Sequence, residues 1–144
     1  MKSKILFFLM VISSFTFAQN ADDVVGNYIS PKKDGILQIY KVGSKYNGKL
    51  IWTKTEGKLD ENNPDPKKRN VPLRGLDIMR GFVFDGDDSW EDGTIYDPKN
   101  GKTYSCEISR ENNGDLNVRG YIGISLLGRT EVFTKTGDNV KALK

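Results

Sequence analysis

The sequence predicts an all-β protein: an eight-stranded antiparallel up-and-down barrel that forms a single domain. After residue 18, no long run has the apolar periodicity of a helix. Short segments rich in Val, Ile, Tyr, Phe, Trp and Thr alternate with clusters of Gly, Asn, Asp and Pro, as in a meandering sheet. One connection, residues 55–75, is long, and the others are short enough for sequential hairpins.

Residues 1–18 are expected to be a cleavable signal peptide. Lys2 and Lys4 precede an apolar run, and the small residues Thr16 and Ala18 lie at positions −3 and −1 of the expected cleavage site. The run is shorter than the roughly 20 apolar residues that span a membrane. We therefore expect an exported protein, periplasmic or secreted. It is not expected to be a lipoprotein, because no cysteine follows the cleavage site.

The expected mature domain is residues 19–144, with a core at about 24–135 and a tail at 136–144. It has 20 Lys and Arg against 19 Asp and Glu, interspersed along the chain, which disfavours nucleic-acid binding. The absence of histidine removes the commonest general base and metal ligand. The single cysteine, Cys106, is interpreted as a buried structural residue. We expect no enzymatic activity, no cofactor and no metal site.

The eight expected strands are residues 24–30, 35–42, 45–54, 76–85, 88–96, 102–110, 115–121 and 129–135. Each is rich in β-branched or aromatic residues, and the segments between them hold most of the turn-forming residues.

Two hairpins allow a prediction of register, because residues that face each other must point to the same side. With a turn at 97–101, Trp90 faces Ile108, Thr94 faces Tyr104, and Tyr96 faces Lys102.

With a connection at 122–128, Val118 faces Val132 and Leu116 faces Thr134. The same register predicts an exposed pair between Arg119 and Glu131.

An outer-membrane barrel would need an apolar outer band and longer strands. Charges at outward positions disfavour it: Lys49, Glu91, Glu107, Arg119 and Glu131. The protein is therefore not expected to span a membrane.

Three prolines in the long connection favour an ordered lid across one barrel end. Its oxygen-bearing side chains, Asp60, Asn62, Asn63 and Asp65, lack the spacing of a calcium loop. The run Lys67–Arg69 is interpreted as a solvated charge run.

Strand 76–85 places Arg80 on one side with Leu76, Ile78, Phe82 and Phe84. In a regular strand Arg80 points inward, where it needs a carboxylate or an anionic ligand head. Alternatively, a bulge near Gly81 turns it to solvent. The predicted ligand-binding residues are Arg80, Phe82, Trp52, Tyr104 and Arg129, although a tryptophan on an apolar strand face is more often core.

The connection 122–128 is unusually apolar, with Ile122, Ile124, Leu126 and Leu127. Such a loop is typical of a protein interface or of a segment that folds back into the barrel. A short helical turn at a barrel end is the simpler alternative.

The chain resembles the bacterial domain-of-unknown-function family 2147 over about residues 25–134. The resemblance rests on Gly48–Trp52, Asn63–Pro66 with Arg69 and Pro72–Leu73, Gly81–Phe82, Gly93 with Ile95–Pro98, Gly101–Tyr104, Val118–Tyr121 and Ser125–Thr130. It implies an exported, lipocalin-like barrel with no established activity. Many relatives have cysteines at the positions of Val42 and Asn47, so a disulfide role cannot be transferred to this chain.

The leading hypothesis is a non-enzymatic envelope protein that binds a small amphipathic or lipid-like molecule in its barrel. The alternative is an interaction module with a solid core that contacts an envelope protein through Ile124, Leu126 and Leu127. An enzyme that uses Asp60, Asp65 or Glu107 is disfavoured, because spacing places no paired acid and base.

Overall fold

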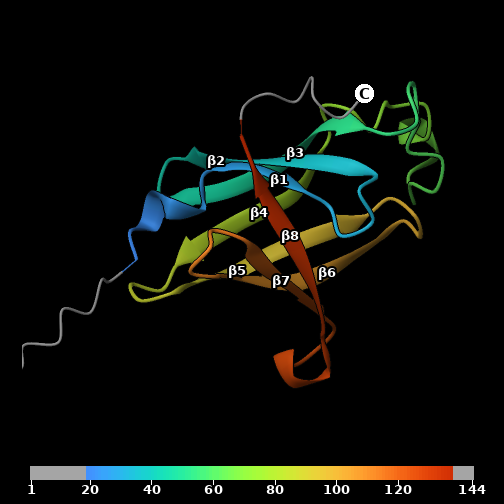
Figure 1. Cartoon of the computed structure of the whole chain (residues 1–144). Helices are drawn as coiled ribbons and strands as arrows, with labels where there is room; N and C mark the ends of the chain where they lie inside the picture. The colour runs from blue at the N-terminus through green and yellow to red at the C-terminus, as the bar shows by residue number, and fades with distance from the viewer. Residues whose placement is uncertain (1–18, 138–144) are drawn as a thin grey trace, which may run out of the picture.

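The structure is a computed structural model that describes residues 19–137. It confirms the predicted all-β barrel: eight strands form a closed antiparallel barrel in sequence order (Figure 1). The strands are β1 (Gly26–Ile29), β2 (Gly35–Val42), β3 (Lys45–Thr53), β4 (Asp77–Phe84), β5 (Ser89–Asp97), β6 (Lys102–Arg110), β7 (Leu116–Tyr121) and β8 (Arg129–Thr136).

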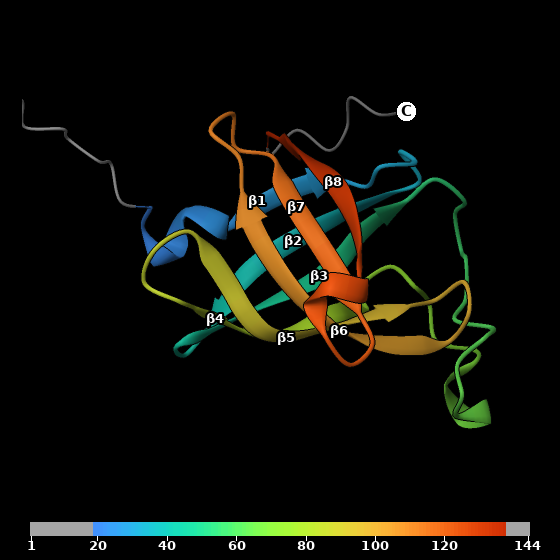
Figure 2. The same ribbon diagram turned by 90° about the horizontal axis from the view of Figure 1, so that it is seen from below.

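Each strand pairs with the next, and β1 pairs with β8 to close the barrel (Figure 2). The predicted strands match the observed ones to within about two residues. Three short 3-10 helices complete the described fold: η1 (Ala21–Val24), η2 (Pro66–Lys68) and η3 (Ser125–Leu127). The predicted signal peptide, residues 1–18, and tail residues 138–144 lie outside the described residues.

Within residues 19–137, no helix is both long and apolar enough to cross a membrane.

Because every connection reverses the chain, the loops alternate between two barrel ends. The closed end comprises residues 19–25, 43–44, 85–88 and 111–115, and the open end comprises residues 30–34, 54–76, 98–101 and 122–128.

The closed end is plugged by η1. Val24 is fully buried, and its carbonyl accepts a hydrogen bond from the Tyr28 hydroxyl at 2.9 Å. Trp90 Nε1 donates to the carbonyl of Ala21, also at 2.9 Å. The predicted first strand therefore begins later than expected, because residues 21–24 form this plug.

The hydrophobic core fills the interior next to the plug. It comprises Val24, Tyr28, Leu37, Ile39, Tyr46, Ile78, Met79, Phe82, Trp90, Cys106, Ile108, Leu116, Val118 and Phe133.

The predicted register of β5 and β6 is correct at one end and wrong at the other. Trp90 faces Ile108 as expected, but Thr94 faces Ser105, and Tyr104 faces Ile95. The register shifts between Trp90 and Gly93, where Asp92 adopts a positive φ of 59°. An extra residue in β5 causes this shift, so Tyr96 faces Thr103 and not Lys102.

The predicted register of β7 and β8 is wrong by one residue. Val118 faces Glu131, and Arg119 faces Thr130, to whose Oγ1 it donates a hydrogen bond at 2.9 Å. Similarly, Leu116 faces Phe133, so the two buried side chains of this end share the inner face.

The predicted pair of Arg119 and Glu131 is replaced by two other ion pairs. Arg119 Nε lies 4.0 Å from Glu107 Oε1 on β6, and Glu131 Oε1 lies 3.2 Å from Arg129 Nη2.

Candidate functional site

The barrel interior is hollow towards the open end. A cavity of about 900 Å³ lies there, bounded by inward side chains of the strands and by the open-end loops. Its apolar strand residues are Leu50, Ile78, Ile95, Val118 and Phe133.

The division between packed and hollow halves follows from side-chain size. A Cβ on Gly93 would lie 2.4 Å from the Phe82 ring, so the ring occupies the space that this glycine leaves. Phe82 is 1% exposed and closes the interior on the core side. In the hollow half, a Cβ on Gly120 would lie 3.6 Å from Ile95, an ordinary contact distance.

Charged side chains of both signs surround the cavity. The cations are Lys32, Lys54, Lys58, Lys99 and Arg129, and the anions are Asp34, Glu61, Asp97 and Glu131. This combination of an apolar interior and a charged mouth is suited to an amphipathic molecule.

One ion pair joins two loops at the mouth. Lys99 Nζ lies 3.0 Å from Asp34 Oδ2, and the Ser30 hydroxyl donates to Asp34 Oδ1 at 2.8 Å. Partial burial raises the pKa of Asp34, but the hydrogen bonds from Ser30 and Lys99 outweigh it and hold this pKa below its ordinary value. Asp34 is therefore ionised at neutral pH and neutralises one cation of the mouth.

Two of the predicted site residues, Tyr104 and Arg129, line the cavity. The hydroxyl of Tyr104 accepts a hydrogen bond from Asn100 Nδ2 at 2.9 Å, which ties it to the β5–β6 turn. Arg129 pairs with Glu131, and its side chain is 80% exposed. It can therefore turn towards a ligand at little steric cost.

The other three predicted site residues do not line the cavity. Arg80 is exposed, so it does not point inward as in a regular strand, and the alternative of a bulge that turns it to solvent is the observed arrangement. The register between β3 and β4 shifts beside it, and Gly81 has a φ of 78°, as in a bulge. Met79, fully buried, takes the inner position.

Phe82 belongs to the core below the cavity, as its packing over Gly93 requires. Trp52 is half-buried and faces Ile36 across the sheet. Ile29 on β1 and Trp52 on β3 both pair with Ile36, so the three side chains lie on the same face of the sheet. The next residue, Leu37, belongs to the core and points to the opposite face. A shift in register after Ile36 puts Trp52 on this outer face.

The connection from β3 to β4, residues 54–76, is an ordered wall of the mouth and is called the long loop. Asp60 within it is 1% exposed and accepts hydrogen bonds from the Tyr96 hydroxyl and from Asn63 Nδ2, both at 2.6 Å. Asn62 Nδ2 donates to the carbonyls of Pro98 and Lys99 at 3.1 Å. The long loop is thereby fastened to the β5–β6 turn.

The contacts of the long loop fix the protonation of Tyr96 and engage the oxygens of the loop. Burial, together with the hydrogen bond to Asp60, raises the pKa of Tyr96 to about 12, so its hydroxyl remains a donor at neutral pH. Asp65 accepts a hydrogen bond from the backbone of Lys67 at the start of η2. The oxygens considered for calcium therefore take part in the structure of the loop itself.

Several lining residues were not predicted, among them Ile95, Val118, Asp34 and Lys99. Alternation along β7 marks Val118 as inward, but it does not tell a packed position from one that borders a cavity. The ion pair between Asp34 and Lys99 joins residues 65 positions apart, so no local pattern indicates it.

A closed eight-stranded antiparallel barrel, plugged at one end and hollow at the other, defines a calyx-shaped protein of the lipocalin-like class. The chain belongs to the family described as "Uncharacterized protein conserved in bacteria (DUF2147)", whose model matches residues 26–135.

A solved structure described as "Protein HP1028 from the human pathogen Helicobacter pylori belongs to the lipocalin family" is similar to the chain. The TM-score is 0.75 with 24% sequence identity, and the alignment covers 83% of this chain and 88% of that one. This likeness supports the fold alone. A search of curated proteins finds no match.

Proposed function

We propose that this is an exported, non-enzymatic protein that binds a small amphipathic or lipid-like molecule in the barrel. The observation that carries the proposal is the cavity of about 900 Å³ at the open end, with its apolar interior and charged mouth. Its volume lies in the range of about 300–1,000 Å³ that is usual for small-molecule sites.

The cavity offers different environments to the two parts of such a ligand. Aliphatic and aromatic side chains from β3, β4, β5, β7 and β8 would remove an acyl chain from water, which is favourable by the hydrophobic effect. A polar head would remain at the mouth, within reach of Lys and Arg side chains. Because Lys99 and Arg129 already pair with carboxylates, an anionic head would exchange one partner for another.

The cavity favours this proposal over a solid barrel that acts as an interaction module. An enzyme is less well supported, because the three acids considered for catalysis have separate structural partners. Asp60 is bonded by Tyr96 and Asn63, Asp65 caps η2, and Glu107 lies beside Arg119.

A cavity-filling substitution tests the proposal. Ile95→Trp places a large ring in the cavity, whereas Val132→Trp places the same ring at a position on β8 that is 48% exposed. Proteins that begin at Gln19 are titrated with a fluorescent fatty acid, and native mass spectrometry after mild extraction detects bound lipid. Ile95→Trp should weaken binding by about tenfold or more, and Val132→Trp should leave it unchanged.

Circular dichroism confirms that both variants are folded. A wild-type protein that carries no lipid after extraction and takes up no member of a lipid panel would overturn the proposal, as would equal binding by folded Ile95→Trp.

A further inference from the structure

Four large apolar side chains stand exposed in the loop between β7 and β8. They are Ile122 (73% exposed), Ile124 (58%), Leu126 (86%) and Leu127 (80%), called here the apolar tip. The loop projects from the barrel below β6 and β7 in the view of Figure 1. Within the described chain, these side chains belong neither to the buried core nor to the cavity lining.

The sequence of this loop suits contact with an apolar medium. Residues 121–128 contain no charged side chain. Gly123 has a φ of 79°, and Leu127 N donates to the carbonyl of Ile124 at 3.2 Å to form the single turn of η3. This turn holds Leu126 and Leu127 outward at the end of a convex projection. Such concentrated exposure of apolar side chains indicates an interaction site.

The charges of the protein are separated between the two barrel ends. The open-end loops contain nine Lys and Arg against five Asp and Glu. The described closed-end segments contain seven Asp and Glu and no Lys or Arg. One of those acids, Asp22, pairs with Lys41 at the end of β2.

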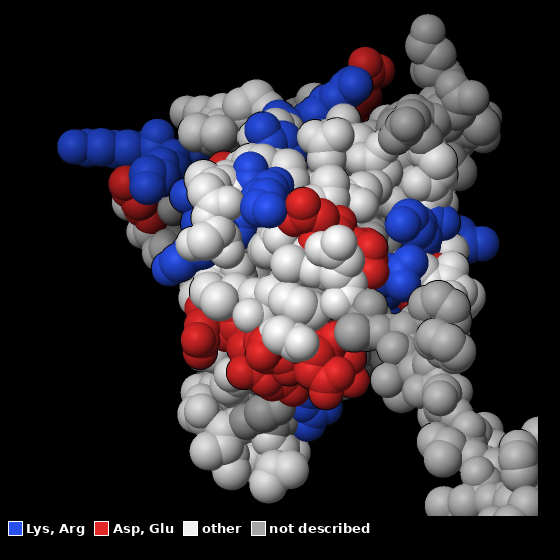
Figure 3. All heavy atoms as spheres, turned by 90° about the vertical axis from the view of Figure 1, so that its left-hand side faces the viewer, with Lys and Arg blue, Asp and Glu red and all other residues white. Residues whose placement is uncertain are grey.

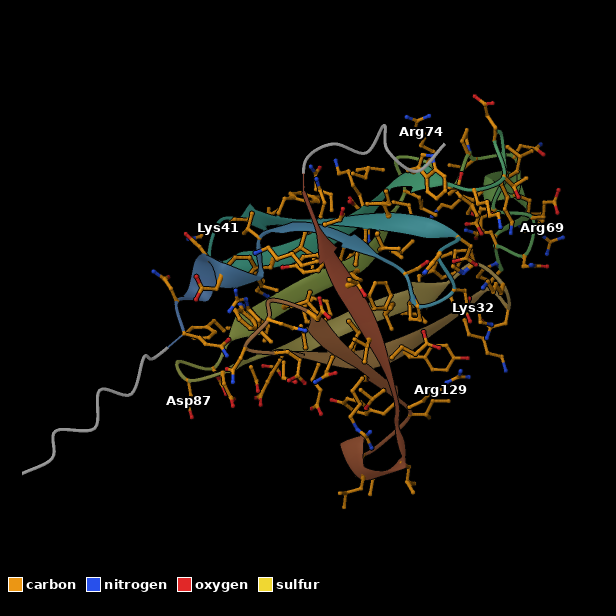
Figure 4. The ribbon with its side chains drawn as sticks, in the orientation of Figure 1. Lys32, Lys41, Arg69, Arg74, Asp87 and Arg129 are labelled. Atoms are coloured by element: carbon orange, nitrogen blue, oxygen red, sulfur yellow. The ribbon has the colours of Figure 1, made fainter. Side chains whose placement is uncertain are left out.

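The figures agree in part with this distribution. Figure 3 faces the closed end and displays a patch of Asp and Glu, with Lys and Arg side chains above and beside it. In Figure 4, Lys32, Arg69 and Arg129 lie on the opposite half of the molecule from Asp87. An approaching anionic surface would therefore attract the open end and repel the closed end.

We propose that the open end docks on an anionic lipid bilayer, with the apolar tip inserted at the level of the headgroups. Insertion of apolar side chains next to basic residues is a recognised mode of peripheral membrane binding. Each Lys or Arg near an anionic surface adds attraction that falls off within a Debye length. The apolar tip and the nine basic residues supply both contributions from the same barrel end.

A bilayer fits these observations better than a protein partner does. The tip is convex and uncharged, and Arg129 follows its loop directly in the sequence, so it suits a soft apolar layer beneath a negatively charged surface. In this orientation the cavity mouth opens near the lipid, which would let an amphipathic ligand pass between membrane and barrel. That last step rests on the proposed ligand binding, whereas docking rests on the tip and the charges alone.

Vesicle flotation tests the inference. Protein that begins at Gln19, and so contains every described strand, is mixed with vesicles of phosphatidylcholine and phosphatidylglycerol or of phosphatidylcholine alone. The wild type should bind the anionic vesicles and lose binding at high salt. Leu126→Asp with Leu127→Asp should weaken binding by about tenfold or more. The matched control is Val42→Asp, because Val42 lies at the closed end and is 50% exposed. This variant should bind as the wild type does.

A second pair of variants tests the charges. Lys67→Glu with Lys68→Glu in η2 should weaken binding to anionic vesicles, whereas Lys45→Glu, near the closed end, should not. Circular dichroism checks that all variants are folded.

Several results would overturn the inference. These are no binding by the wild type, equal binding to both kinds of vesicle, or an equal loss in the closed-end controls. A dimer in solution that the Leu126 and Leu127 substitutions dissociate would identify the tip as a contact between copies instead. Uptake of the fluorescent fatty acid without vesicles is measured on the same variants, so a failure of ligand binding is seen separately from a failure of docking.

Discussion

Gly93→Ala should destabilise the fold strongly, because the Phe82 ring occupies the space next to this glycine. A Cβ at this position would lie 2.4 Å from two ring carbons, whereas ordinary contact begins near 3.4 Å. The ring must therefore move by about 1 Å within a core where it is only 1% exposed. Displacement of close-packed side chains costs about 1–3 kcal/mol, and complete loss of a buried phenylalanine costs about 3–5 kcal/mol.

We expect a loss of about 2–4 kcal/mol in the free energy of unfolding, measured by urea denaturation. Gly120→Ala is the matched control, since both glycines lie inside strands and neither has a positive φ. A Cβ at Gly120 meets Ile95 at 3.6 Å, so this variant should be neutral or more stable by about 0.5–1 kcal/mol.

The cause is tested by adding Phe82→Leu. If the clash is responsible, Gly93→Ala should cost much less in the Phe82→Leu background than in the wild type. A cost below about 0.5 kcal/mol for Gly93→Ala alone, or the same cost in both backgrounds, would refute the reasoning.

Three further predictions concern individual side chains. Burial raises the pKa of the Cys106 thiol to about 12, so the folded protein should not react with a thiol reagent near pH 8 until urea unfolds it; rapid labelling when folded would contradict this. A hydrogen bond from Lys41 is the main cause that lowers the pKa of Asp22 below its ordinary value of 3.8. Asp22→Asn should therefore reduce stability at neutral pH, and the difference in urea midpoint should shrink as the pH falls below about 4; a constant difference would argue against the effect. Tyr96→Phe removes a donor from the buried Asp60 carboxylate, so trypsin should cleave the long loop faster, and an unchanged cleavage rate would show that this bond does not fasten it.

Much of the fold could be predicted from local patterns. Strand 102–110 was predicted with its observed bounds, because Gly101 and Asn112–Gly114 mark the flanking turns and β-branched and aromatic residues fill the interval. The same holds for strand 35–42. The first strand was predicted too long, because the four residues of η1 plug the barrel through contacts with Trp90, which is distant in the sequence.

The candidate site was predicted only in part, and bulges explain most of the difference. The prediction of inward side chains assumes that successive residues of a strand point strictly to alternate faces, and one additional residue reverses the faces of all residues after it. The bulge near Gly81 turns Arg80 outward while Phe82 stays inward, and the shift after Trp90 places Gly93 beneath the Phe82 ring. Tyr104 and Arg129, which were predicted as ligand-binding residues, both line the cavity and lie near strand ends at the open end.

The sequence by itself therefore determined the fold class, the positions of the strands and the family resemblance, since alternation and turn chemistry are local properties. Tertiary structure alone decided which half of the barrel is packed and which is hollow. That division depends on pairs such as Phe82 with Gly93, and on ion pairs such as Asp34 with Lys99, whose members meet only when the barrel closes. The polarity of the two ends arises in the same way, because charges dispersed along the chain are sorted by the alternating direction of the strands.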